Sequence, residues 1–142
     1  MTYPVTLATD PETGQVMARF PDIPEAITVG ANATDALRHA LDALLCALAG
    51  YIASGRPIPE ASTKAAEKPA IDLPAIVSAK LALYTAMRRQ AITQTALAEK
   101  LGVDPRQVRR LLDLDHRSRM DQLEAALAAL GMRLVVSAEE AA

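Results

Sequence analysis

Basic and amide side chains gather on one short predicted helix in the C-terminal half of the sequence. Within the stretch Pro-Arg-Gln-Val-Arg-Arg-Leu-Leu at 105–112, apolar residues recur at helical spacing, which predicts a helix with one buried face. The other face carries Arg106, Gln107, Arg109 and Arg110. Arginine and glutamine pair with guanine and adenine edges in the major groove, and arginine also binds phosphates. This pattern therefore indicates recognition of DNA.

Another short helix is predicted immediately before this one, starting at Thr93 and Gln94 and with Leu97, Ala98 and Leu101 on one face. Gly102 follows it where the chain has to turn, since glycine enters the left-handed region without steric cost. Asp104 and Pro105 are typical of the N-cap and the first position of the next helix. Two short helices around a glycine, with cations on the second, predict a helix-turn-helix motif. The alternative is an ordinary helical hairpin whose arginines are simply solvated.

The polar residues of this motif have different expected roles. Arg106 and Arg110 lie four positions apart on one face and are expected to read base edges, while the residues beside them contact bases or phosphates. Thr93 and Gln94 lie at the start of the first helix, where backbone N–H groups favour an anion. We therefore expect this pair to bind a phosphate.

Charge is distributed unevenly along the chain. Residues 1–60 contain three basic and seven acidic side chains, whereas residues 78–137 contain ten basic and six acidic ones. This asymmetry predicts a polyanionic partner for the C-terminal half and a cationic partner for the N-terminal half. Ordinary scatter of surface charge is the competing explanation.

Candidate catalytic residues are few. A metal-dependent nuclease needs clustered carboxylates, but Asp10, Glu12 and Asp22 lie in turn-forming sequences that explain them without catalysis. His39 and His116 have no metal-ligand spacing. We therefore expect no catalytic residue, no metal and no cofactor.

The remaining composition indicates a cytoplasmic protein without a membrane partner. No uninterrupted apolar run approaches the roughly 18 residues of a membrane span. A single cysteine excludes an internal disulfide and suits a reducing compartment.

The first half of the chain predicts a small sheet and one long helix. Strands are expected over 3–7, 15–20, 26–29 and 70–73, and a helix over about 33–52. Asn32 is the expected N-cap, with Asp35 in a position resembling a capping box. The expected buried stripe of the helix is Ala33, Leu37, Leu41, Leu44, Leu48 and Tyr51.

The second half predicts a helical unit. A helix over 74–90 precedes the helix-turn-helix, and a last helix is expected from a Ser118 cap, with Asp121 in its capping box, to Gly131. Residues 132–136 are expected to form a strand. This unit has a thin core, which predicts dimerisation. The expected class is α+β, with domains at 1–73 and 74–142 and a loop or linker at 60–69.

The chain resembles the HicB antitoxins of bacterial toxin–antitoxin pairs, specifically those that end in a helix-turn-helix. The resemblance covers nearly the whole length. It is carried by Tyr3-Pro-Val, an acidic turn with Gly14, Phe20-Pro-Asp-Ile-Pro24, Thr28-Val-Gly30, the capped helix with Ala36-Leu37, Gln94 through Leu112, and Leu123-Glu-Ala-Ala-Leu-Ala-Ala-Leu-Gly131. One departure is Glu25-Ala26, where many relatives have glycine and cysteine.

This resemblance implies both a fold and two partners. The N-terminal domain would be a partial ribonuclease-H-like α/β unit without catalysis. It would bind and mask a basic HicA toxin that cleaves messenger RNA, and the all-α C-terminal domain would bind operator DNA as a dimer. Toxin neutralisation is expected from residues 1–73 alone, through Asp10, Glu12, Asp22 and Glu25, because turns and corners project side chains outward.

Two other functions compete with this interpretation. One is a working ribonuclease-H-type nuclease, which the scattered carboxylates disfavour. The other is a stand-alone transcription regulator whose N-terminal domain senses a small molecule. A short basic reading frame beside the gene would distinguish the antitoxin from this regulator.

Overall fold

The computed structural model describes residues 1–62 and 69–141. The chain forms two compact units, Met1–Leu73 and Pro74–Ala142. Within the described residues, strands occur in the first unit and four of the five helices in the second, which is consistent with the predicted α+β class. Most of the loop predicted at 60–69 lies outside the described residues.

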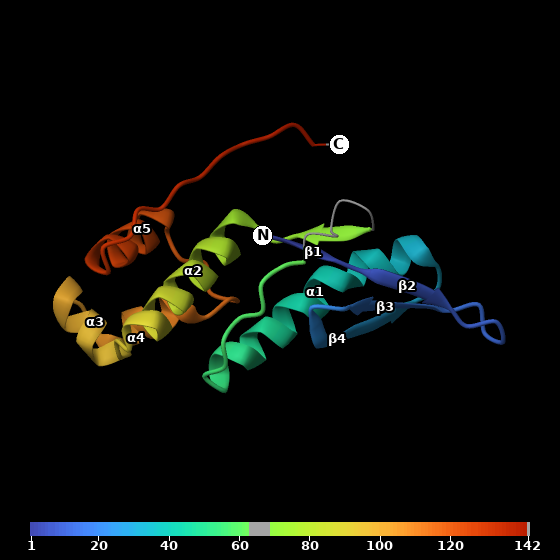
Figure 1. Ribbon diagram of the computed structural model, residues 1–142, viewed down its shortest axis with the longest axis horizontal. Coiled ribbons are helices and arrows are strands. Elements are labelled where there is room, and N and C mark those ends of the chain that lie inside the picture. Colours follow the sequence, from blue (N-terminus) through green and yellow to red (C-terminus); the bar gives the residue numbers. More distant parts are fainter. Residues whose placement is uncertain (63–68, 142) are drawn as a thin grey trace. The chain divides into compact units, whose positions relative to one another are not determined.

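The first unit contains two antiparallel strand groups. Strands β2 (Thr6–Thr9), β3 (Val16–Phe20) and β4 (Ile23–Gly30) form a three-stranded sheet in that order. Strands β1 (Thr2–Pro4) and β5 (Ala70–Asp72) pair with each other. Helix α1 (Ala33–Ala53) runs along the three-stranded sheet (Figure 1).

The strand predicted over residues 3–7 is two strands in the structure. The backbone N–H of Val5 donates to the carbonyl of Pro69 at 2.7 Å, so the chain leaves one pairing partner and joins another at this residue. The prediction for β3 is confirmed, because Val16, Ala18 and Phe20 alternate into the core. Strand β4 begins three residues earlier than the predicted 26–29 and ends one residue later, at Gly30.

Helix α1 begins as its sequence predicts. The side chain of Asn32 accepts a hydrogen bond from the backbone N–H of Asp35 at 2.9 Å, which confirms Asn32 as the N-cap. The carboxylate of Asp35 reaches back to accept from the N–H of Ala31 at 2.8 Å. One N–H group of the first turn and one just before the N-cap are therefore satisfied.

The buried stripe of α1 differs from the prediction. The helix buries Ala36, Ala40, Leu44, Leu48 and Tyr51, whereas Ala33 is exposed and Leu37 and Leu41 are half-buried. The physical reason lies at Gly30, where a Cβ atom would come within 2.2 Å of the backbone nitrogen of Ala36. Because the helix approaches the end of β4 this closely, alanines face the sheet and the larger leucines flank them. The expectation that Leu41 is deeply buried was wrong.

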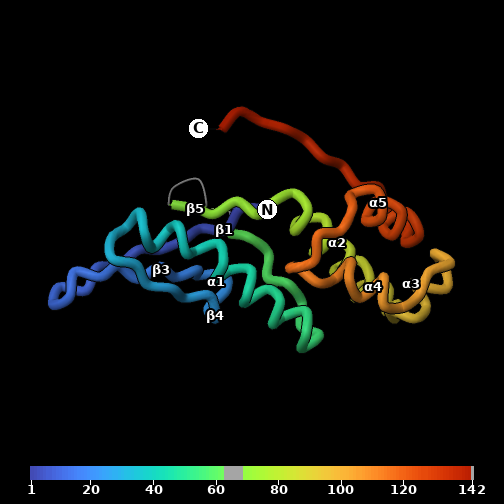
Figure 2. Tube along the Cα trace, turned by 180° about the vertical axis from the view of Figure 1, so that it is seen from behind, coloured from blue at the N-terminus to red at the C-terminus, as the bar shows by residue number. Residues whose placement is uncertain are grey.

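The second unit is built from helices α2 (Ala75–Gln90), α3 (Gln94–Leu101), α4 (Pro105–Leu112) and α5 (Met120–Ala129), shown in Figure 2. These bounds match the predicted helices closely. Contacts of α2 with α4 and α5, and of α3 with α4 and α5, enclose the core. Its large fully buried members are Leu81, Leu83, Leu97, Leu123 and Leu127.

Two predictions for the end of the chain were wrong. Helix α5 is capped at Arg119, whose N–H donates to the Gln122 side chain at 3.4 Å, because the Ser118 hydroxyl binds other partners. Residues 132–136 form no strand in the structure. A strand requires a hydrogen-bonded neighbour, and among the described residues of this unit there is none for this segment to pair with.

Among the described residues, one helix is long and apolar enough to cross a membrane by length and composition alone. This helix is α1, with 21 residues and a mean hydropathy of 1.3 over its most apolar window. It also packs on β3 and β4 through its buried stripe. Packing in a core accounts for its apolar character.

The corrected stripe predicts how α1 responds to substitution. Leu44→Ala should lower the free energy of unfolding by about 2–4 kcal/mol, because it removes a fully buried side chain. Leu41→Ala is the matched control and should cost clearly less, since Leu41 is only half-buried. Urea unfolding followed by circular dichroism measures both, and equal losses would contradict the register.

Candidate nucleic-acid interface and partner-binding face

The turn between α3 and α4 has well-defined backbone geometry. Gly102 has φ of 67°, in the left-handed region that favours glycine. The N–H of Val103 donates to the carbonyl of Ala98 at 3.0 Å, which closes the end of α3. The Asp104 carboxylate then accepts from the N–H of Arg106 at 2.8 Å and caps α4, as its sequence predicts.

Helix α4 divides cleanly into a buried and an exposed face. Val108, Leu111 and Leu112 are buried against the unit. The exposed positions carry all four predicted DNA contacts, Arg106, Gln107, Arg109 and Arg110. Three cations and one amide are therefore presented together on two turns of helix.

The charges near the start of α4 are partly balanced. The guanidinium of Arg106 lies 3.4 Å from the Asp104 carboxylate, and both side chains are largely exposed. Hydrogen bonds from the backbone N–H and the side chain of Arg106 lower the pKa of Asp104 below its usual value. The Asp104 carboxylate therefore loses its charge only at a lower pH than an unperturbed aspartate would.

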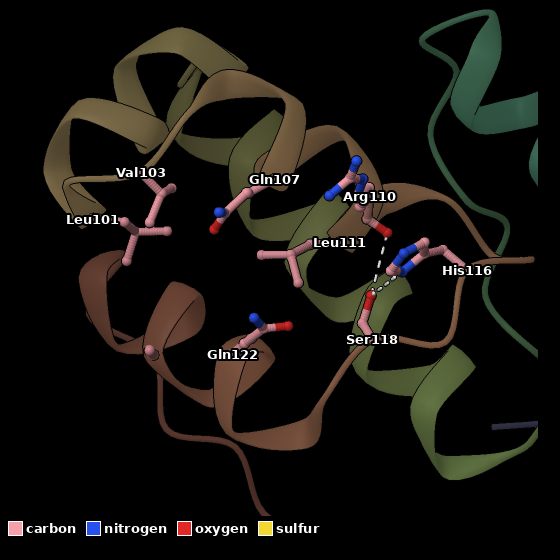
Figure 3. Close-up of a pocket in the computed structure, with 9 residues that line it drawn as sticks. Leu101, Val103, Gln107, Arg110, Leu111, His116, Ser118 and Gln122 are labelled. Carbon is pink, nitrogen blue, oxygen red and sulfur yellow. Dashed lines mark hydrogen bonds between the residues drawn. The ribbon is translucent and has the colours of Figure 1, made fainter.

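A cavity of about 270 Å³ lies beside the exposed face of α4 (Figure 3). Gln107 and Arg110 line it from α4, and Gln122 lines it from α5. Leu101 and Val103 contribute apolar walls. The structure thus brings two of the predicted DNA contacts to one hollow.

The two predicted phosphate contacts lie together at the start of α3. Thr93 is the N-cap, and its hydroxyl oxygen accepts from the N–H of Ala96 at 3.0 Å. The hydroxyl proton is not used in this bond. Thr93 and Gln94 are exposed and line, with Arg88, a second hollow of about 300 Å³.

A buried lysine holds the other end of α4. Lys80 on α2 is fully buried, and its Nζ donates to the carbonyls of Arg110 at 2.9 Å and Asp113 at 2.7 Å. It also donates to the hydroxyl of Ser118 at 2.8 Å. Ser118 in turn donates to the Arg110 carbonyl at 3.3 Å (Figure 3). One ammonium group therefore joins α2, the end of α4 and the segment that leads into α5.

The electrostatics of Lys80 fit this position. Burial lowers the pKa of its ammonium group below the usual value, and the nearby Asp113 opposes that shift. The three oxygen acceptors compensate for lost hydration, and a cation at the C-terminal end of a helix also interacts favourably with the helix dipole. Periodicity placed Lys80 on α2 but gave no sign of this role, because its partners lie 30 to 38 positions away.

The four predicted toxin contacts separate into two pairs. Asp10 and Glu12 lie in the exposed turn between β2 and β3, where the Asp10 carboxylate accepts from the N–H of Glu12 at 2.9 Å. Asp22 is half-buried and accepts from the N–H of Ser62 at 2.7 Å. The outward projection expected of all four side chains is therefore not found at Asp22.

Glu25 is engaged within its own unit. The Tyr51 hydroxyl donates to its carboxylate at 2.6 Å, and Arg56 donates to the other oxygen at 3.2 Å. The hydrogen bond from Tyr51, assisted by Arg56, lowers the pKa of Glu25. The Arg56 guanidinium also lies 3.9 Å from the centre of the Tyr51 ring. Glu25 thus has a clear structural role within its own unit.

An apolar surface that sequence reasoning missed lies on the sheet. Ile27 and Val29 on β4 are 47% and 43% exposed, although both are large and apolar. Met17 is paired with Val29 across the ladder, and both line a hollow of about 370 Å³ with Asp10. The sequence did contain a signal for this surface. Ile27 and Val29 are both β-branched and occupy alternate positions of the strand predicted over 26–29.

Comparisons with known proteins decide the family. The sequence model of a family described as HicB-like antitoxins of bacterial toxin–antitoxin systems matches residues 2–82. The chain belongs to the HicB antitoxin family. Antitoxin HicB of Escherichia coli K12 is 38% identical over 94% of this chain and 96% of that protein. Antitoxin HicB 2 of Photorhabdus laumondii is 39% identical over 94% of both chains.

A third relative, antitoxin HicB of Pseudomonas fluorescens, is 36% identical over 92% of this chain and 90% of its own length. These matches extend through the second unit, beyond the region that the family model covers. As a HicB-family antitoxin, the chain is a component of a bacterial toxin–antitoxin system and has a toxin partner.

The hydrogen bonds of the Lys80 ammonium lead to a prediction about the stability of the protein. Lys80→Met keeps the apolar stem but removes the buried ammonium that donates to two carbonyls and to the Ser118 hydroxyl of this antitoxin, so the unfolding free energy should fall by about 2–3 kcal/mol. Lys100→Met, on the exposed side of α3, is the control and should change it by less than about 0.5 kcal/mol. Chemical denaturation measures both variants, and an unchanged Lys80→Met would contradict the role of the ammonium.

Proposed function

We propose that this antitoxin binds and masks a HicA-type toxin that cleaves messenger RNA, and that it represses its own operon by binding operator DNA. The observation that carries the second activity is the presentation of Arg106, Gln107, Arg109 and Arg110 on the exposed face of the capped helix α4. The acidic first unit and the family membership support the first activity. Both take place in the cytoplasm.

In the DNA-binding activity, α3 and α4 act as a helix-turn-helix with α4 in the major groove. Arg106 and Arg110 read base edges, and Gln107 and Arg109 contact bases or phosphates beside them. Thr93 and Gln94 at the start of α3 bind a phosphate of the same half-site. A homodimer then recognises an inverted repeat whose half-sites lie roughly 34 Å apart.

In the toxin-binding activity, the first unit is a partial ribonuclease-H-like domain that binds without catalysis. An RNA-cleaving toxin must present cations to phosphate, and the exposed Asp10 and Glu12 supply opposite charge. The apolar surface of Met17, Ile27 and Val29 lies on the same sheet and supplies area for burial. Asp22 and Glu25 contribute at the edge of the contact while holding their internal partners.

The first test of this proposal measures operator binding. Arg106→Ala and Arg110→Ala should each weaken binding to the operon's own promoter by about 1–3 kcal/mol, because each removes a base contact. Arg38→Ala removes an equal charge from an exposed site on α1 and should have little effect. Fluorescence anisotropy at one fixed salt concentration gives all three affinities. Full affinity in both α4 variants would remove these residues from the interface.

The second test separates the two activities in the full-length chain. Ile27→Glu combined with Asp10→Lys should weaken toxin binding at least tenfold and fail to rescue growing cells from the toxin, while operator binding stays unchanged. The double variant Arg106→Ala/Arg110→Ala should do the reverse. Surface plasmon resonance and a growth assay provide the two readouts. If the sheet variant still neutralised the toxin fully, the toxin would bind elsewhere.

A further inference from the structure

The segment that follows α5 has the pattern of a strand with one buried face. Between residues 132 and 139, the even positions are all apolar: Met132, Leu134, Val136 and Ala138. Three of the four odd positions are polar: Arg133, Ser137 and Glu139. Because side chains alternate between the two faces of a strand, this pattern predicts an amphipathic strand.

The structure leaves this segment without a strand partner. It continues from α5 as an extended chain with no strand assigned (Figures 1 and 2). Val135 and Val136 are 71% and 61% exposed, which is unusual for two adjacent β-branched residues. Within the described part of the second unit there is no other strand that could pair with it.

The start of the segment is nevertheless fixed to the helices. Gly131 ends α5 with φ of 75°, and the N–H of Met132 donates to the carbonyl of Leu127 at 2.9 Å. The side chain of Gln90 on α2 donates to the carbonyl of Leu130 at 2.8 Å. The segment therefore leaves the helices of the second unit from a defined point. An element that joins the second units of two copies needs such a fixed start.

We propose that residues 132–139 pair with the same residues of a second copy as an antiparallel ribbon, and that this ribbon joins two DNA-binding units. The need for two units rests on the operator binding proposed above. Attraction between oppositely charged side chains favours one register of the two strands. When Val136 faces its own copy, Arg133 of each chain lies opposite Glu139 of the other, which forms two ion pairs across the ribbon.

The same register also places the apolar positions together. Leu134 of each chain faces Ala138 of the other, on the same face as the central valine pair. A two-stranded ribbon alone is marginal in water, so this face has to lie on helices. Helix α5 exposes the small residues Ala125 and Ala128 immediately before the segment, which permits a close approach.

A cross-linking experiment tests the pairing directly. In the full-length chain with Cys46→Ser, Val136→Cys should form a disulfide-linked dimer under mild oxidation, because directly opposite residues are within disulfide reach. Val135→Cys is the matched control, because position 135 and its copy are two residues out of register, roughly 7–8 Å apart. Linkage through position 136 alone supports the ribbon, whereas linkage through 135 alone, or through neither, overturns it.

A solution measurement tests whether the ribbon supports assembly. Val136→Glu should raise the dissociation constant of the dimer at least tenfold by sedimentation, whereas Val135→Glu should change it by less than about threefold. Arg133→Glu should also weaken the dimer, and adding Glu139→Arg should restore it. A dimer that is indifferent to Val136→Glu would overturn the proposal. A Cys46→Ser/Val136→Cys chain that cross-links through position 136 but fails to bind its operator would refute the DNA-binding proposal and still support the ribbon.

Discussion

The buried ammonium of Lys80 fixes the end of α4, and the direction of the α4 side chains depends on it. Helix α4 contains only eight residues, and isolated helices of that length are unstable in water. Its N-terminal end is capped by Asp104 and its C-terminal carbonyls by the Lys80 ammonium, so both ends are held by charged groups. The lysine also binds Ser118 and thereby fixes the path into α5. The arginines of α4 are thus displayed by a scaffold whose central polar contact comes from another helix.

The first unit depends on a different constraint, the close approach of α1 to its sheet. Gly30 leaves no room for a side chain against the backbone of Ala36, so small residues must face the end of β4. This packing covers one face of the three-stranded sheet and leaves Met17, Ile27 and Val29 on the other. Among the described residues, one helix packs on this sheet and covers one of its faces. The opposite face therefore keeps the apolar surface that is available to a partner.

The features that sequence predicted well are those determined by neighbouring residues. The Asn32 cap, the turn at Gly102 and the Asp104 cap each involve groups within a few positions of one another. The exposed face of α4 also followed from local periodicity. Contacts between distant residues could not be found in this way. Ser118 has the type of an N-cap residue, but Lys80 engages its hydroxyl from another helix.

Two further differences have the same origin. The buried stripe of α1 shifted from the leucines to Ala36 and Ala40 because the distance between helix and sheet is set by Gly30, a residue of another element. The strand pattern of residues 132–136 is real in sequence, but a strand exists only with a neighbour. Hydrophobic periodicity describes which face of a segment is buried and does not reveal what buries it.

Sedimentation of a fluorescently labelled operator tests most directly whether two separate surfaces of this antitoxin act in one molecule. The labelled operator is measured with the antitoxin alone and then with saturating amounts of its cognate toxin. We expect a heavier complex that contains DNA, antitoxin and toxin together, because we propose that the toxin binds the first unit and the operator binds α3 and α4. Release of the operator as the toxin binds, with no complex of all three, would contradict it.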